Sequence, residues 1–145
     1  MAEARELMDR ATDAIFGNDL DAFRACYAPD VVFTAPDIGT GHGVENLVTW
    51  MAEFQAAIPD MTYEKTRELE SGNCAVDEGY VLGTNTGPIA MPDGSTLPAT
   101  GRTVRLRSID VATVENGLIS KHDFYFDQLE FLTQLGLMEA PQATV

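Results

Sequence analysis

The residue in this sequence best suited to proton chemistry is His122, near the end of the chain. It stands in a run over 118–126 in which residues alternate as in a strand with one buried face. The face that carries His122 also carries Leu118, Ser120, Phe124 and Phe126. Because this face is the more apolar, we expect it to line a cavity, where an imidazole can donate or accept a proton near neutral pH. The alternative is a histidine that only forms hydrogen bonds across the sheet.

Two arginines on the preceding expected strand, 101–114, are candidate partners for His122. Arg105 and Arg107 share one face of that strand, and antiparallel pairing would bring a guanidinium near the same cavity. There it would be a strong donor to a carboxylate, enolate or phenolate oxygen. The alternative for each arginine is an ion pair at the surface or at an interface, since arginine is rarely buried without a partner.

Asp127 is a second candidate for catalysis, at the point where the strand over 118–126 gives way to an expected short helix over 128–135. The alternative is a helix N-cap, because Glu130 follows three residues later, which is the spacing of a capping box. This spacing favours the cap over chemistry.

Residues in and after a glycine-rich segment are candidates for substrate binding. His42 lies in the glycine-rich turn expected over 39–43, before a helix whose first backbone amides favour negative oxygens. Trp50, on that helix, would form part of a pocket wall. The alternatives are a turn that only connects two elements and an aromatic side chain that only fills the core.

The elements that must position these residues follow from the spacing of apolar residues. Helical spacing predicts helices over about 4–15, 20–26 and 44–54, closed by Gly17-Asn18, Ala28-Pro29-Asp30 and Pro59-Asp60. A period of two predicts strands over 62–68, 74–85, 101–114 and 118–126, with a brief strand over 31–33. Asn116-Gly117 predicts a tight hairpin, and prolines predict a long connection over 87–100. Helices before an antiparallel sheet indicate one α+β domain over residues 1–145.

The composition excludes some classes of partner. Nine Lys and Arg against 23 Asp and Glu give a net charge of −14, which nucleic acid and anionic lipid would repel. The sequence has no membrane-length apolar run and no secretory signal, so we expect no membrane contact and a cytoplasmic location. Cys26 and Cys74 are expected to be free thiols, and no metal-ligand spacing or cofactor motif occurs.

Five short motifs occur in order along the chain. They are Ile58-Pro59-Asp60-Met61, Gly83-Thr84-Asn85-Thr86-Gly87, Ala99-Thr100-Gly101-Arg102, Val114-Glu115-Asn116-Gly117-Leu118-Ile119, and Tyr125-Phe126-Asp127-Gln128 continuing to Gln134-Leu135-Gly136. Together they resemble the SnoaL-like polyketide cyclase family of the nuclear-transport-factor-2-like superfamily. The resemblance implies a cone-like, curved antiparallel sheet wrapped by N-terminal helices around a small-molecule pocket. Because the family includes cyclases, isomerases, epoxide hydrolases and pockets without known chemistry, the fold does not fix the reaction.

Two positions depart from the pattern that the resemblance implies for cyclases. The histidine position is kept as His122, but Phe124 stands where the catalytic aspartate is expected, and Asn85 stands where a histidine is frequent. We therefore expect a cofactor-independent enzyme that transfers a proton on an oxygenated, largely apolar, polyketide-like substrate, as a cyclase, isomerase or hydratase does. His122 would be the acid and base, and an arginine or Asn85 would hold the developing oxyanion.

The rival hypothesis is a non-catalytic module for small-molecule binding or assembly, in which Phe124 fills the place of the acid. The resemblance also implies a homodimer that forms through the outer face of the sheet. Ile119 and Tyr125 are expected to be apolar members of that face.

Overall fold

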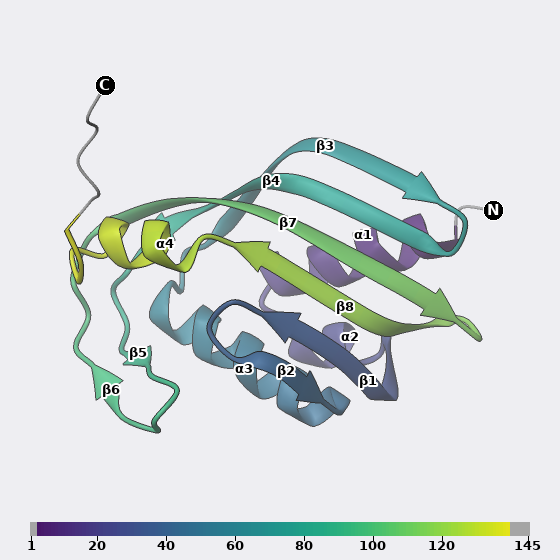
Figure 1. Ribbon diagram of the computed structural model, residues 1–145, viewed down its shortest axis with the longest axis horizontal. Coiled ribbons are helices and arrows are strands. Elements are labelled where there is room, and N and C mark those ends of the chain that lie inside the picture. Colours follow the sequence, from purple (N-terminus) through teal and green to yellow (C-terminus); the bar gives the residue numbers. More distant parts are fainter. Residues whose placement is uncertain (1–2, 140–145) are drawn as a thin grey trace.

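A curved six-stranded sheet dominates the computed structural model of the protein, which describes residues 3–139 (Figure 1). The strand order across the sheet is β2-β1-β8-β7-β4-β3. These strands are β1 (Tyr27–Ala35), β2 (Gly39–His42), β3 (Thr62–Ser71), β4 (Cys74–Thr84), β7 (Thr103–Glu115) and β8 (Leu118–Phe126). The connection between β4 and β7 contains a small hairpin of β5 (Ile89–Ala90) and β6 (Thr96–Leu97).

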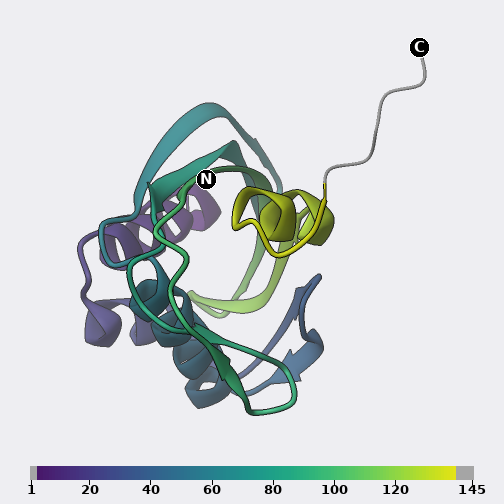
Figure 2. The same ribbon diagram turned by 90° about the vertical axis from the view of Figure 1, so that its left-hand side faces the viewer.

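Helices cover the concave side of the sheet and one of its ends. They are α1 (Glu3–Phe16), α2 (Leu20–Arg24), α3 (Val44–Ala57) and α4 (Gln128–Gln134). α1 contacts β3, β4, β7 and β8, whereas α3 contacts β1, β2 and β5. Figure 2 shows the sheet bending around α1, α2 and α3, with α4 near the end where β8 stops. The predicted α+β class, a curved sheet wrapped by N-terminal helices, is confirmed.

The apolar stripe that predicted the first helix is the face that α1 buries. Ala4, Leu7, Met8, Ala11 and Ile15 are all buried there, and they join residues of α3 and of the inner sheet face in one core. None of the helices within residues 3–139 is long and apolar enough to cross a lipid bilayer. The Cys26 and Cys74 side chains are free thiols.

One pair of neighbouring strands departs from the predicted antiparallel sheet, because β1 runs parallel to β8. β1 also begins at Tyr27, four residues before the expected brief strand and on the far side of Pro29. Its pairing with β8 shifts register between Tyr27 and Val32. Proline has no N–H to donate, so this interruption accommodates Pro29 within the strand.

The glycine-rich segment expected to be a turn is instead strand β2, which pairs antiparallel with β1. Gly41 lies opposite Phe33, and a Cβ at this position would lie 2.3 Å from the ring atom Cζ of Phe33. The glycine therefore leaves room for a core aromatic ring. This close packing, and not a turn, explains why a glycine stands at this position.

The hairpin between β7 and β8 forms at Asn116-Gly117, as predicted. Asn116 and Gly117 have φ values of 53° and 78°, the left-handed conformations that a two-residue hairpin turn requires. Just after the turn the register shifts, so that Ile119 pairs with Val114 and is fully buried. The expectation that Ile119 lies on the outer face is wrong, because strict alternation breaks at this irregularity.

Candidate active site

A cavity of about 100 Å³ lies between the inner face of the sheet and helices α1 and α3. Its wall consists chiefly of aromatic and aliphatic side chains, with Tyr27, Tyr63, Ser108, Asp110 and His122 among the polar ones. An apolar cavity of roughly 150 Å³ holds a benzene molecule. A cavity of this size therefore suits a molecule of about one small ring.

Two buried side chains, those of Tyr27 and His122, and the half-buried side chain of Asp110 form a hydrogen-bonded chain at this cavity. The hydroxyl of Tyr27, on β1, lies 2.8 Å from Nδ1 of His122, on β8. Nε2 of the same imidazole lies 2.7 Å from Oδ2 of Asp110, on β7. His122 is 2% exposed, so both ring nitrogens are used within the protein. The sequence predicted that His122 exchanges a proton directly with a substrate. Both ring nitrogens already bond to protein side chains, so neither is left for that role.

Burial determines the direction of these hydrogen bonds. Removal from water, followed by the negative charge of Asp110, raises the pKa of Tyr27 well above its usual value. The phenol therefore keeps its proton and can donate it to Nδ1 of His122. With Nδ1 as acceptor, the proton of a neutral imidazole sits on Nε2, where it is donated to the Asp110 carboxylate.

Asp110 is the member of this chain that faces the cavity. Its side chain is 18% exposed, and His122 engages Oδ2, which leaves Oδ1 free of protein donors among residues 3–139. The hydrogen bond from Nε2 of His122 fixes the orientation of the carboxylate. A held carboxylate beside an apolar cavity is suited to general base and acid chemistry.

Asp110 is a candidate site residue that the sequence did not predict. Alternation places Arg105 and Arg107 on one face of the strand, which leaves Asp110 on the other. The register pairs Asp110 directly with Phe124, the position where the resemblance implies an aspartate. The carboxylate thus lies one strand away from its expected place. The signal was present in the alternation, but the choice of inner face was wrong.

An aromatic wall separates this polar chain from solvent. The Phe124 ring stacks on His122 with centroids 4.0 Å apart and planes 14° apart. Trp50, on α3, packs against Phe124 at 4.9 Å and donates from Nε1 to Asp37 at 3.0 Å. Phe126 continues the wall beside Phe54. The structure therefore brings the predicted Trp50, Phe124 and Phe126 together with His122.

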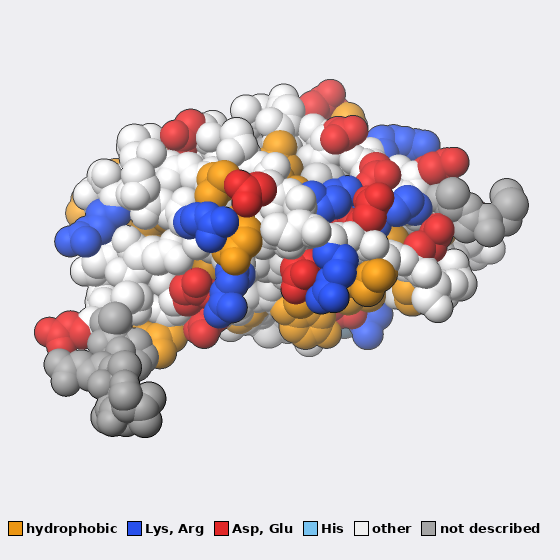
Figure 3. Space-filling view, turned by 90° about the horizontal axis from the view of Figure 1, so that it is seen from above, with side chains coloured by type: hydrophobic (Ala, Val, Ile, Leu, Met, Phe, Trp, Pro, Cys, Tyr) orange, Lys and Arg blue, Asp and Glu red, His pale blue; other side chains and the backbone are white. Residues whose placement is uncertain are grey.

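Arg105 and Arg107 lie outside the cavity, so the expectation that a guanidinium reaches it is wrong. Their side chains are 57% and 69% exposed. Arg105 lies over the Tyr80 ring at 3.6 Å, and Arg107 pairs with Glu130 at 3.7 Å. Figure 3 shows this outer face of the sheet, where basic, acidic and hydrophobic side chains intermingle. The surface ion pair, the alternative named for each arginine, is what the structure shows.

Asn85 does not line the cavity either, because its side chain is consumed by the backbone around it. Nδ2 donates to the carbonyls of Ala57 and Gly87 at 2.9 and 3.0 Å. Oδ1 accepts from N and Oγ1 of Thr100 at 2.7 and 2.9 Å. With no exposed surface, Asn85 ties both ends of the long connection to the end of α3. This network leaves it no hydrogen bond to offer a substrate oxygen.

His42 and Asp127 are both exposed and lie away from the cavity. His42 was expected in a turn, but it lies on the edge strand β2. Asp127 caps α4, since Oδ1 accepts from the backbone N–H of Glu130 at 3.1 Å. The capping alternative for Asp127 therefore agrees with the structure.

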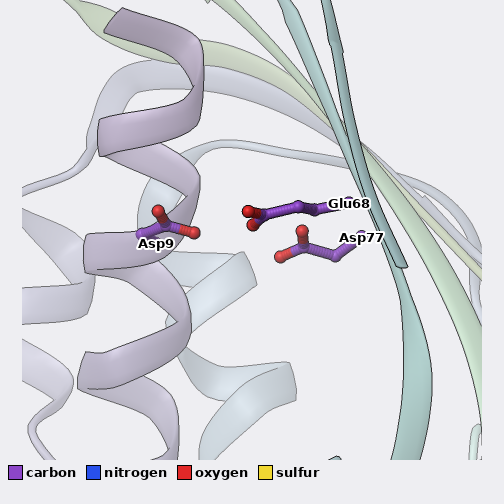
Figure 4. A group of neighbouring side chains, drawn as sticks. All are labelled: Asp9, Glu68 and Asp77. Carbon is purple, nitrogen blue, oxygen red and sulfur yellow. The ribbon is translucent and has the colours of Figure 1, made fainter. Parts of the chain in front are cut away.

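A second cluster of acids lies beside the candidate site, between α1 and the sheet. Figure 4 shows the carboxylates of Asp9, Glu68 and Asp77 pointing toward one another. Arg5 lies 2.6 Å from Asp77 and 2.8 Å from Asp9. Lys65 lies 3.0 Å from Glu68. These two cations already supply the positive charge that a metal ion would bring.

Asp77 connects this cluster to the candidate site. It pairs with Asp110 across β4 and β7, and its side chain is fully buried. Burial first, and then the charge of Asp110, raises the pKa of Asp77 above its usual value, although Arg5 and Lys65 oppose the shift. The charge of Asp110 therefore acts on the buried carboxyl of Asp77, which Arg5 contacts.

The chain shows clear similarity to known proteins in both sequence and fold. The family described as SnoaL-like domain matches residues 8–122. No curated protein matches the sequence. A candidate SnoaL-like polyketide cyclase from Jannaschia sp. CCS1 superposes with a TM-score of 0.83 at 17% identity, over 97% of this chain and 94% of that one.

Two further solved structures show how varied proteins of this fold are. IdmH from Streptomyces antibioticus, described as a candidate polyketide cyclase, has a TM-score of 0.75 and 25% identity, over 92% of this chain and 98% of its own. An epoxide hydrolase of Mycobacterium tuberculosis that resembles LEH has a TM-score of 0.69 and 17% identity, over 92% and 90%. One fold therefore carries different named chemistries.

Proposed function

Since the chain belongs to the SnoaL-like domain family, we propose that it is a cofactor-independent enzyme that transfers a proton on a small, oxygenated and largely apolar molecule. The observation that carries the proposal is the Asp110 carboxylate, which faces an apolar cavity and is held by His122, whose other ring nitrogen bonds to Tyr27. Isomerisation or ring closure through an enolate is the reaction class that fits a single held carboxylate.

The proposed roles differ from those expected from the sequence. Asp110 takes a proton from carbon and returns it, and His122 is a positioning residue that orients Asp110 through Nε2. The aromatic wall excludes water, which strengthens electrostatic interactions with the reacting atoms. A multi-ring polyketide is larger than a cavity of about 100 Å³, so the size of the cavity favours a smaller substrate.

The test is exchange of α-hydrogens of small cyclic ketones in D₂O, followed by NMR, because exchange reports proton transfer without knowledge of the natural substrate. Wild type should accelerate exchange, and Asp110→Asn should lower the rate by about 10²–10⁴-fold. His122→Gln should lower it less, with ligand affinity kept within several-fold. Asp13→Asn, an exposed carboxylate on α1, is the matched control and should leave the rate unchanged.

The rival function, binding without chemistry, gives a different result. Ketones would bind to wild type, as detected by a thermal shift, but no exchange above the buffer rate would occur. Equal exchange by wild type and Asp110→Asn would also remove the carboxylate from the mechanism.

We also propose that the protein forms a homodimer through the outer face of the sheet. Tyr125 is 55% exposed and Ile109 is 37% exposed there, next to Arg105 and Arg107. Exposed aromatic and arginine side chains are enriched at protein interfaces. Light scattering should give twice the chain mass of 15.8 kDa, and Tyr125→Glu should shift it toward the monomer. A monomer at tens of micromolar wild-type protein would contradict this proposal.

A further inference from the structure

The hydroxyl of Tyr63, on β3, is a buried polar group at the same cavity as Asp110. Among residues 3–139 no hydrogen-bond partner reaches it. A phenol hydroxyl can both donate and accept a hydrogen bond, and leaving it unpaired away from water costs free energy. Such orphaned groups in a folded protein require an explanation, and a polar atom held in the cavity would supply the missing partner.

The neighbours of Tyr63 fix the direction in which its hydroxyl points. Its ring stacks on Phe16 of α1, with centroids 5.3 Å apart and planes 16° apart. A Cβ on Gly79 would lie 2.8 Å from Cζ and 2.9 Å from the hydroxyl oxygen of Tyr63, so only glycine leaves room for the phenol. Gly79 pairs with Ser108, and Asp110 follows two residues later on the same face of β7. The phenol thus extends along the inner face toward Asp110.

The charges around the Tyr63 hydroxyl determine what kind of ligand it can take. Burial first, and then the charges of Asp110 and Asp77, raises the pKa of Tyr63 above its usual value. The hydroxyl therefore keeps its proton and can donate it. The same two carboxylates repel an anionic ligand, whereas a neutral acceptor oxygen meets no such penalty. A carbonyl oxygen is a neutral acceptor that a single ring can carry.

We infer that Tyr63 donates a hydrogen bond to the carbonyl oxygen of a neutral ketone of about one small ring, whose α-carbon faces Asp110. This inference rests on the proposed function and names its substrate class. In the step, the α C–H bond breaks and the proton bonds to Asp110. The electron pair moves into an enolate, whose oxygen takes the hydrogen bond from Tyr63. Return of the proton to carbon restores the carboxylate, so charge is conserved.

Binding to Tyr63→Phe tests the hydrogen bond apart from the chemistry. The probes are cyclopentanone and methylenecyclopentane, which share a shape but differ in the oxygen, titrated by NMR. Tyr63→Phe should weaken cyclopentanone binding by about 3- to 10-fold and leave the hydrocarbon unchanged. The carbonyl stretch of bound cyclopentanone should move to higher frequency in the variant. Tyr80→Phe, on the outer face, is the matched control and should behave as wild type.

α-Hydrogen exchange then separates failure of this inference from failure of the proposed function. Tyr63→Phe should lower cyclopentanone exchange by about 10²–10³-fold, the usual effect of removing an oxyanion donor. Exchange that depends on Asp110 but not on Tyr63, with an unchanged carbonyl stretch, would overturn the inference and leave the function standing. If cyclopentanone binding depends on Tyr63 but no exchange occurs, the hydrogen bond from Tyr63 is supported and the proposed proton transfer is contradicted.

Discussion

Replacing Asn85 by aspartate would decide whether this residue holds the fold or binds a ligand. Asn85→Asp keeps the shape of the side chain but exchanges the amide NH₂, which donates to the carbonyls of Ala57 and Gly87, for an oxygen that cannot donate when ionised. Two buried carbonyls lose their donor, and an unsatisfied buried group costs about 1–3 kcal/mol. We expect the free energy of unfolding to fall by about 2–6 kcal/mol.

The loss should depend on pH, since the introduced carboxyl is buried beside two carbonyl oxygens. Both features raise its pKa in the folded state above the unfolded value. A group with a raised folded-state pKa contributes stability that is present at low pH and lost as the pH rises through that pKa. The gap between Asn85→Asp and wild type should therefore narrow as the pH falls from 7 toward 5, because the protonated carboxyl can donate again.

Urea unfolding followed by the fluorescence of Trp50 measures the free energy of unfolding and its dependence on pH, and thermal unfolding measures Tm. For 145 residues an entropy of unfolding of about 0.3 kcal/mol/K converts the expected loss into a fall in Tm of about 7–20 °C. Asn18→Asp, an exposed turn position, is the control and should change stability by less than about 0.5 kcal/mol. If Asn85→Asp is as stable as wild type, the hydrogen-bond network is refuted. If Asn85→Asp has normal stability but no longer binds the ketone, Asn85 contacts the ligand.

Two further predictions concern the other carboxylates. Asp127→Ala should lower the free energy of unfolding by about 1 kcal/mol, whereas Asp127→Asn should keep it, because Asn caps a helix about as well; loss of turnover in a stable Asn variant would instead make Asp127 catalytic. Because the pKa of Asp77 is raised in the folded state, the contribution of this carboxyl to the stability of wild type falls as the pH rises above about 4, so Asp77→Asn should gain stability relative to wild type between pH 4 and 7 in urea unfolding. A relative loss over that range would show that the ion pair with Arg5 outweighs burial.

Local patterns predicted most of the elements, because the signals lie within a few residues. The stripe of α1 and the Asn116-Gly117 turn each follow from spacing or from a required backbone conformation. β8 matches its predicted bounds, 118–126. Ile119 was misplaced because a register shift between two strands leaves no mark in the sequence of either. The fold class was therefore accessible, whereas irregularities of pairing were not.

The candidate site was predicted only in part, because it depends on contacts between distant segments. Alternation grouped His122 with Phe124 and Phe126 correctly. It could not tell which face of β7 is inside, and so it offered Arg105 and Arg107 in place of Asp110. Tyr27 reaches the site because β1 pairs parallel with β8, and no local sequence pattern predicts this pairing.

That parallel pair also bears on the order in which the protein folds. Phe33 pairs with His122 across 89 residues, and closing a loop of that length costs roughly 4 kcal/mol in chain entropy beyond a constant term. β1 and β2 form a local hairpin, and β3, β4, β7 and β8 form a meander, so each half can begin to form alone. The two halves join through β8, which follows every other strand described within residues 3–139 and is therefore synthesised after them. The hydrogen bond between Tyr27 and His122 should therefore be among the late events of folding, and a chain that has not yet made β8 exposes β1 as an unpaired strand edge open to aggregation.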